Sequence, residues 1–211
     1  MKVLVVAAHP DDEVLGCGGT MAGLAAAGHE VHVAIAGAGR GPEQAVGLAR
    51  AAAIMGAQVP VLGYDLFEDN EADGRPLLPL VRWVEARIAD VGPEVVYTHH
   101  EGDLNVDHHA VARAVLTATR PGLSGVKEVY AFQVPSSTEW AFGVWTFDPN
   151  VFVDVTGTLG AKLEALRCYP GEMRAFPHPR SEECVRAYAA VWGSVAGVRA
   201  AEAFRLVRKV P

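Results

Sequence analysis

Hydrophobic and polar positions come in alternating blocks along the first half of the chain, and these blocks predict strands and helices in turn. Residues 3–8 form a continuous apolar run, which is typical of a buried parallel strand. Residues 14–28 are rich in alanine and leucine at helical spacing, and this pattern stops at Gly28. The same criteria predict strands at 30–36, 59–62 and 95–98, and helices at 42–56, at about 79–91 and from about residue 108. This order predicts a mostly parallel, Rossmann-like α/β sheet with helices on both faces.

The second half of the chain has a less regular pattern. Strands are predicted at 129–133 and 151–155, and helices at 157–167 and 181–193. The segment 200–207 has no assigned element and is expected to pack on the domain or on a neighbouring copy, which leaves a homo-oligomer open. Neither an internal repeat nor a linker is evident, so we expect one domain over residues 1–211.

Composition and charge exclude several classes of protein. The 211 residues carry a formal net charge of −7, which gives no basic footprint for nucleic acid or an anionic membrane. The cysteines, Cys17, Cys168 and Cys184, are odd in number and widely spaced, so neither a disulfide framework nor a cysteine zinc site is indicated. The first apolar run is too short for a membrane span or a signal peptide, and we expect a cytoplasmic protein.

Three ionisable side chains follow the first predicted strand directly: His9, Asp11 and Asp12. In open α/β sheets, ligands bind at the carboxyl ends of the strands. Crowded carboxylates at such a turn favour a divalent metal among them. The alternative is that one of the aspartates only caps the following helix.

A second histidine-rich segment, residues 99–109, follows the strand predicted at 95–98 and should project from the same edge of the sheet. His108 follows Asn-Val-Asp at a predicted helix start and is the candidate for the metal. We expect the other histidines of this segment to be solvated loop residues; they are His99, His100 and His109.

These two segments resemble the motifs of the PIG-L or LmbE-like family of metal-dependent de-N-acetylases. The family's first motif, an apolar strand followed by His-Pro-Asp-Asp-Glu and a glycine cluster, matches residues 3–20. Its second motif, His-x-Asp-His or a close variant, matches residues 105–108. The resemblance extends over about the first 120 residues, and segments 136–140 and 177–181 look less closely like one bacterial branch of the family.

The resemblance implies that His9, Asp12 and His108 bind the metal and that Asp11 is the general base. Two histidines and one carboxylate leave an open position for water on Zn²⁺, although the same ligands accept Fe, Co or Mn. The implied substrate is an N-acetylglucosamine-type small molecule, and the implied reaction is removal of its acetyl group.

One position departs from the family pattern. Asn105 occupies the place where many members have a histidine, and an amide can donate a hydrogen bond to substrate but cannot serve as a general acid. The acid for the leaving amine must then come from elsewhere, or Asp11 must carry the proton alone. His178 is the preferred candidate, with His99 and His100 behind it; the alternative is that His178 is a surface residue in a proline-rich turn.

Polar residues on the other strand-end loops are candidates for binding the sugar. Arg40 follows the second strand and Asp69 follows the third, where Asn70 and Asp73 also lie. Either Trp140 or Trp145 could stack on a sugar face, while the other fills the core.

Glycines 16, 18 and 19 come too late after the strand for a dinucleotide-binding loop, so they are expected to allow close packing of helix on sheet. Cys17 among them is expected to be a small buried residue. Two further hypotheses stay open: an amidase for a larger acyl group or a thiol-sugar conjugate, and a metal- or nucleotide-binding module without hydrolytic activity.

Overall fold

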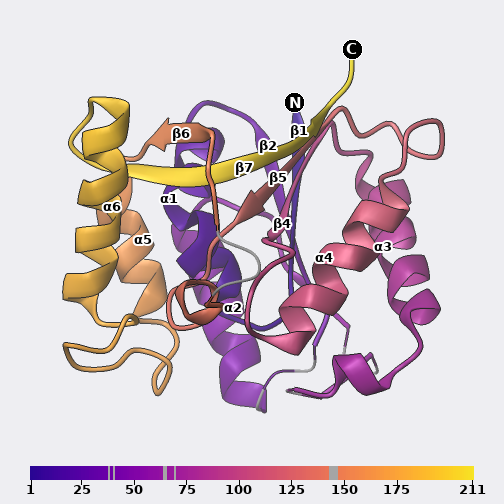
Figure 1. The fold of residues 1–211 in the computed structure, drawn as a ribbon, viewed down its shortest axis with the longest axis horizontal. Helices are drawn as coiled ribbons and strands as arrows, with labels where there is room; N and C mark the ends of the chain where they lie inside the picture. The colour runs from indigo at the N-terminus through magenta and orange to yellow at the C-terminus, as the bar shows by residue number, and fades with distance from the viewer. Residues whose placement is uncertain (38, 40, 64–65, 69, 143–146) are drawn as a thin grey trace.

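The computed structural model describes residues 1–211 except 38, 40, 64–65, 69 and 143–146, and except the side chain of residue 73. Its strands form one seven-stranded sheet in the order β3-β2-β1-β4-β5-β7-β6 (Figure 1). The strands are β1 (Lys2–Ala7), β2 (Glu30–Ile35), β3 (Val61–Leu62), β4 (Val95–His99), β5 (Glu128–Phe132), β6 (Val151–Asp154) and β7 (Ala201–Lys209). The pairs from β3 to β5 are parallel, while β7 runs antiparallel to both β5 and β6. The prediction of a mostly parallel α/β sheet in a single domain is therefore confirmed.

Helices cover both faces of the sheet, as the sequence predicts (Figure 1). One core packs α1 (Asp12–Ala26), α2 (Pro42–Ile54), α5 (Leu159–Leu166) and α6 (Glu182–Ala196) against the sheet. A second core packs α3 (Leu77–Val91) and α4 (Val106–Ala118) against the opposite face. Two short 3-10 helices, η1 (Ala72–Gly74) and η2 (Thr138–Trp140), lie in the loops.

The segment expected to pack on the domain or on a neighbour is the strand β7, inserted between β5 and β6. The sequence pattern did not indicate a strand there because the first four residues of β7 are all buried and only the later ones alternate. Two of those buried residues are alanines and one is a glutamate, which strands seldom favour.

Helix α1 is interrupted at Cys17, whose backbone angles (φ −145°, ψ 24°) are not helical. The interruption leaves backbone groups unpaired in the middle of a buried helix. Lys162 Nζ donates to the carbonyl oxygen of Leu15 at 2.9 Å, and the carboxylate of Glu202 accepts from the amides of Gly19 and Thr20 at 2.9 and 2.7 Å. Lys162 and Glu202 also pair with each other at 2.6 Å. These two side chains therefore act as caps for the two halves of α1.

The glycine cluster of α1 allows the close packing that the sequence predicts. A Cβ atom added to Gly16 would overlap the ring of Phe132 on β5, and one added to Gly19 would lie 2.8 Å from Val155. Cys17 is fully buried, as expected for a small core residue.

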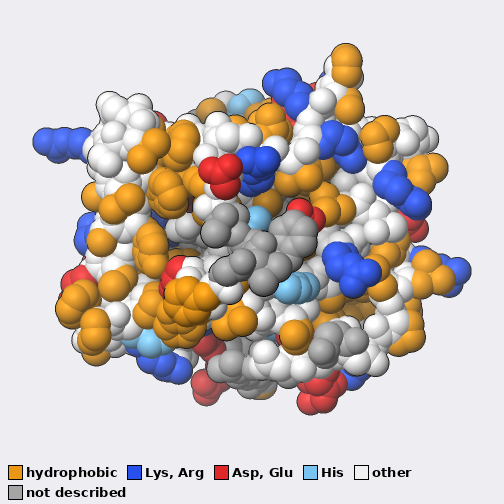
Figure 2. Space-filling model, in the orientation of Figure 1, with side chains coloured by type: hydrophobic (Ala, Val, Ile, Leu, Met, Phe, Trp, Pro, Cys, Tyr) orange, Lys and Arg blue, Asp and Glu red, His pale blue; other side chains and the backbone are white. Residues whose placement is uncertain are grey.

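In the part of the chain that the structure describes, the face of the molecule shown in Figure 2 has no concentrated basic patch. On the face shown in Figure 2, lysine and arginine side chains are scattered among acidic and hydrophobic ones. Among the described residues, every helix is too short or too polar to cross a membrane.

Candidate metal centre and adjoining cavity

The candidate site lies at the carboxyl ends of β1 and β4. These strands are neighbours in the sheet, yet β2 and β3 extend it on the far side of β1 and β5 on the far side of β4. This reversal of strand order is a topological switch point, where open α/β sheets form a ligand crevice. The prediction that the loop after β1 and the loop after β4 meet at one edge is confirmed.

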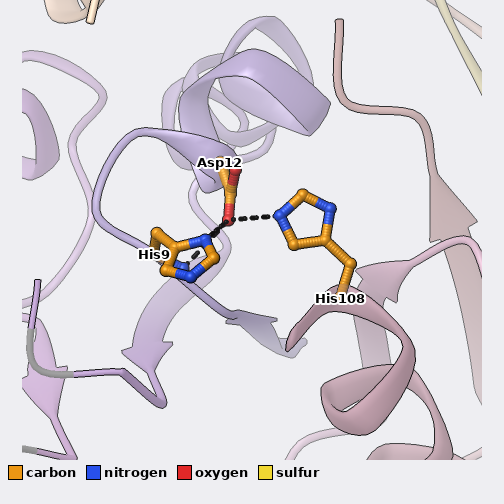
Figure 3. A group of neighbouring side chains, drawn as sticks. All are labelled: His9, Asp12 and His108. Carbon is orange, nitrogen blue, oxygen red and sulfur yellow. Dashed lines mark hydrogen bonds and ion pairs between the residues drawn. The ribbon is translucent and has the colours of Figure 1, made fainter. Parts of the chain in front are cut away.

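His9, Asp12 and His108 converge in this crevice and form a group that could bind a metal ion. One donor atom from each lies within 4.8 Å of the others. The carboxylate oxygen Oδ2 of Asp12 is 3.2 Å from Nδ1 of His9 and 3.2 Å from Nε2 of His108. The two imidazoles face Asp12 from the β1–α1 turn and from the start of α4 (Figure 3).

The Asp12 carboxylate has a feature that fits a metal ligand. Its side chain is fully buried, and its second oxygen, Oδ1, has no hydrogen-bond partner among the described residues. A buried carboxylate oxygen without a donor is costly unless a cation binds there. The donor set of two imidazoles and one carboxylate suits Zn²⁺ and leaves a coordination position open.

Two further aspartates hold the histidines in place. Asp107 Oδ2 lies 2.8 Å from His9 Nε2, while Nδ1 of the same ring faces Asp12. Asp103 Oδ1 lies 3.1 Å from His108 Nδ1 on the other side of the group. Carboxylates in this position fix the tautomer and orientation of metal-binding histidines. The sequence pattern did not indicate either role, although both aspartates lie within five positions of His108.

These two carboxylates are themselves held in place by hydrogen bonds from other loops. Asp107 accepts from the backbone amides of Asn70 and Ala72 at 2.6 and 2.9 Å. Asp103 accepts hydrogen bonds from the hydroxyls of Ser137 and Thr138. The loop before η1 and the loop containing η2 therefore support the two histidines from opposite sides.

The charges of the group strongly affect its protonation. Burial alone would lower the pKa of His9, but Asp107 and Asp12 raise it to about 10; Asp12 and Asp103 similarly raise the pKa of His108 to about 9. Burial would raise the pKa of Asp12, but the adjoining histidines hold it well below its usual range. The field that favours protons on these imidazoles is the same field that attracts a metal cation.

Asp11 lies beside this group with its side chain in a polar cavity of about 80 Å³. Burial and the charge of Asp12 raise the pKa of Asp11 well above its usual range, although the Arg180 guanidinium opposes this shift. The cavity is also lined by His9, Asn105 and Arg180. Asp11 is therefore placed to exchange a proton with a molecule in the cavity.

Asn105 is the N-cap of α4, where its Oδ1 accepts from the backbone amide of Asp107 at 2.8 Å. Its side chain is thus fixed at the cavity wall by the same helix start that carries His108. A histidine at this position would not provide that cap.

The other predicted contacts divide into three groups. His178 lies in the turn before α6, where its Nδ1 accepts from the Arg180 amide and its ring meets Trp140 edge-on at 6.3 Å. Of the predicted contacts, Asn70 lines the cavity, whereas His178 is not among its described lining residues. Arg180, which the sequence did not single out, also lines the cavity. Arg40, Asp69, Trp145 and the side chain of Asp73 lie outside the described residues.

The expectation of solvated histidines at 99 and 100 was wrong. His99 is 1% exposed and His100 is 8% exposed. His99 Nε2 accepts from the amide of Ala8 at 2.8 Å, and its ring stacks on His108 with 3.9 Å between centroids. Burial lowers the pKa of His99 to about 3, so it is neutral and helps fix the turn after β1. His109 is partly buried against the Asp103 carbonyl. Trp140 is 42% exposed and so is not a core residue.

Comparison with known proteins gives the class that this fold and site define. Residues 4–119 match the model of the PIG-L family, described as GlcNAc-PI de-N-acetylase. The chain is 30% identical over 175 residues to the uncharacterized deacetylase YaiS of Escherichia coli K12. The matched region covers 78% of this chain and 88% of YaiS. The chain belongs to the PIG-L family of de-N-acetylases, which are hydrolases of amide bonds.

Solved structures share the fold over nearly the whole chain. The conserved protein TT1542 of Thermus thermophilus matches with a TM-score of 0.80, 25% identity and coverage of 99% of this chain and 96% of TT1542. The N,N'-diacetylchitobiose deacetylase of Pyrococcus horikoshii matches with a TM-score of 0.77, 21% identity and coverage of 98% and 84%.

The same fold also carries a different reaction. GalB of Pseudomonas putida KT2440, a 4-carboxy-2-hydroxymuconate hydratase, matches with a TM-score of 0.77, 22% identity and coverage of 100% and 97%. The reaction of this chain must therefore be argued from its own site residues, and not from the fold alone.

Proposed function

We propose that this chain removes the acetyl group from an N-acetylated amino sugar of the N-acetylglucosamine type, or from a conjugate of one, with Zn²⁺ as its cofactor. The observation that carries the proposal is the convergence of His9, Asp12 and His108 beside a polar cavity that Asp11 lines. Family membership supplies the amide-hydrolase chemistry, and the diacetylchitobiose deacetylase with the same fold supports an N-acetyl sugar as substrate.

The proposed ligands of Zn²⁺ are His9, Asp12 and His108. When bound, the ion supplies Lewis-acid chemistry, lowering the pKa of water and polarising a carbonyl oxygen. The donor chemistry fits this ion, but other divalent metals accept the same ligands. The identity of the metal is therefore part of the proposal.

Asp11 is proposed as the general base that takes a proton from the attacking water. It borders both the metal group and the cavity, so a molecule in the cavity is within reach of its carboxylate. The Asn105 side chain would donate a hydrogen bond to the substrate without transferring a proton. Arg40 and Asp69 remain proposed sugar contacts on the neighbouring loops.

The leaving amine needs a proton, and two residues compete for that role. Asp11 could return the proton it has accepted, whereas His178 would act as a separate acid. The cavity lining favours Asp11, because His178 is not among the described lining residues. His178→Ala distinguishes the two: an unchanged kcat supports proton return by Asp11, and a large fall in kcat supports His178.

The size of the cavity favours an acetyl group over a larger acyl group. The cavity has a volume of about 80 Å³. An N-acetyl group fits such a volume, while a long acyl chain would have to extend out of it.

The test is an amine-release assay on a panel of N-acetylglucosamine conjugates, including N-acyl chains of increasing length. Protein loaded with Zn²⁺ is compared with chelator-treated protein and with Asp12→Ala. We expect release from acetylated substrates by the loaded protein only. Absence of release from every substrate would contradict the proposed function.

A further inference from the structure

Arg180 connects three separate segments at the wall of the cavity. Its Nη1 donates to Asp11 Oδ2 at 2.8 Å and to Glu172 Oε2 at 3.1 Å. Its Nε donates to the Ser136 hydroxyl oxygen at 2.8 Å. The turn after β1, the loop between α5 and α6, and the loop after β5 therefore meet at one guanidinium group.

The backbone at this site is held in an unfavourable conformation. Three non-glycine residues of the described chain have positive φ: Asp11 (117°), Asn70 (62°) and Ser136 (74°). Asp11 and Asn70 line the cavity, and Ser136 contacts Arg180. Such conformations persist when surrounding contacts over-determine them, and they cluster at functional sites.

Asp11 is held by contacts to its backbone amide and by contacts to its carboxylate. Its backbone amide donates to Glu13 Oε2 at 3.0 Å, and Glu13 is bound by the hydroxyl of Tyr169. Its carboxylate is bound by Arg180, a side chain fixed in turn by Ser136 and Glu172. A planar guanidinium tied at Nε and Nη1 has little freedom to rotate, so it fixes the direction of the carboxylate that it binds.

We propose that Arg180 is the positioning residue for Asp11 and that Oδ1 of Asp11 is the oxygen that exchanges the proton with water. Oδ2 is committed to Arg180, whereas no described residue donates a hydrogen bond to Oδ1. This inference rests on the proposed function, because it assigns the geometry of the proposed base. Arg180 itself has no proton to give at neutral pH and stays a donor of hydrogen bonds.

The first arm of the test measures turnover of the best substrate in the panel by Zn²⁺-loaded variants. Arg180→Met should lower kcat by about 100-fold with KM nearly unchanged, because misplacing a catalytic group by about 1 Å has an effect of that size. Arg180→Lys should recover part of kcat, since it retains the charge without the planar fork. Glu172→Gln removes the negative charge of one acceptor of the guanidinium and should lower kcat by less than Arg180→Met.

Arg167→Met is the matched control. Arg167 lies in the same region of the sequence and pairs with Glu182 at 2.6 Å, but it is exposed and is not among the residues that line the cavity. It should leave kcat and KM unchanged. Equal losses in both arginine variants, or a full kcat in Arg180→Met, would overturn the proposal.

The second arm does not depend on activity. Crystal structures of the wild type, Arg180→Met and Arg180→Lys should show Asp11 rotated in the methionine variant, while Asp12 stays between His9 and His108. An Asp11 carboxylate that keeps its place without Arg180 would overturn the inference. If the wild type hydrolyses none of the substrates, the proposed function fails, and the structures still decide whether Arg180 positions Asp11. If the methionine variant does not fold, the lysine variant provides both measurements.

Discussion

Two buried clusters of charged side chains lie against helix α1, one at its interruption and one at its start. They differ in how completely their polar atoms are paired. At the interruption in the helix, the oxygens of Glu202 accept from Lys162 and from the two amides exposed by the break. At the beginning of the helix, Asp12 Oδ2 faces two imidazoles, but Oδ1 has no partner among the described residues. The first cluster is fully paired within the protein, and we propose that a cation completes the second.

This difference separates a structural role from a ligand-binding role. A buried polar network that is fully paired makes the fold more rigid, whereas an unpaired buried atom requires an explanation such as an ion. Both clusters would look alike in a list of buried charged residues. Their hydrogen bonds distinguish them, and the following variants test that distinction.

The largest effect is expected at Asp12. Asp12→Ala should abolish stoichiometric Zn²⁺ binding and lower turnover at least about 1,000-fold, because a metal supplies several kcal/mol of transition-state stabilisation. Metal content and amine release measure this. Asp90→Ala, at an exposed aspartate paired with Arg87, is the control and should change neither quantity. Retention of one tight Zn²⁺ in Asp12→Ala would contradict the ligand assignment.

The next effect concerns the complete cluster. Lys162→Met should lower the free energy of unfolding by about 3–5 kcal/mol, because it leaves the buried Glu202 charge without its partner. Denaturant unfolding measures this, and the Zn²⁺ affinity should not change. Adding Glu202→Gln should recover part of the loss by removing the unpaired charge. Lys127→Met, which breaks an exposed pair with Glu94, should lower stability by less than about 1 kcal/mol.

A smaller effect is expected from the metal itself. Free Zn²⁺ at 100 times its Kd should raise the free energy of unfolding by about 2.7 kcal/mol, since the folded protein binds it and the unfolded chain does not. The rise should be present in Lys162→Met and absent in Asp12→Ala. An equal rise in all three proteins would mean that Zn²⁺ binds outside the proposed group.

The smallest effect is expected at the carboxylate behind His9. Asp107→Asn should weaken Zn²⁺ binding about 10- to 100-fold, because the imidazole loses the partner that fixes its tautomer. Calorimetric titration measures the change. Asp148→Asn, at an exposed aspartate, serves as the control and should not alter the affinity. An unchanged affinity in Asp107→Asn would remove Asp107 from the support of the metal group.

The sequence predicted the parallel half of the fold because mostly apolar strand segments alternate there with segments of helical pattern. It also predicted which residues converge, since the ends of two parallel strands must lie at one edge. It did not predict β7 or the roles of Lys162 and Glu202. These depend on contacts between residues 40 or more positions apart, and the sequence pattern contains no local signal for them.

The same limit applies within the site. His99 looked like a solvated histidine because nothing local indicates that its ring binds the amide of Ala8, 91 positions away. Arg180 lies two residues after His178, and the sequence favoured the histidine on chemical type alone. The backbone direction of the turn decides which of the two lines the cavity, and that direction is a property of the tertiary structure.

The position of Glu202 on β7 has a consequence for the order in which the molecule assembles. The amides of Gly19 and Thr20 are made 183 and 182 residues before Glu202, their acceptor. Until residue 202 has been added, the Glu202 carboxylate is not there to accept from these two amides, so α1 lacks this pair of hydrogen bonds. A contact of such long sequence separation slows folding. Completion of the helix that carries Asp12 is thus coupled to the pairing of β7 with the sheet.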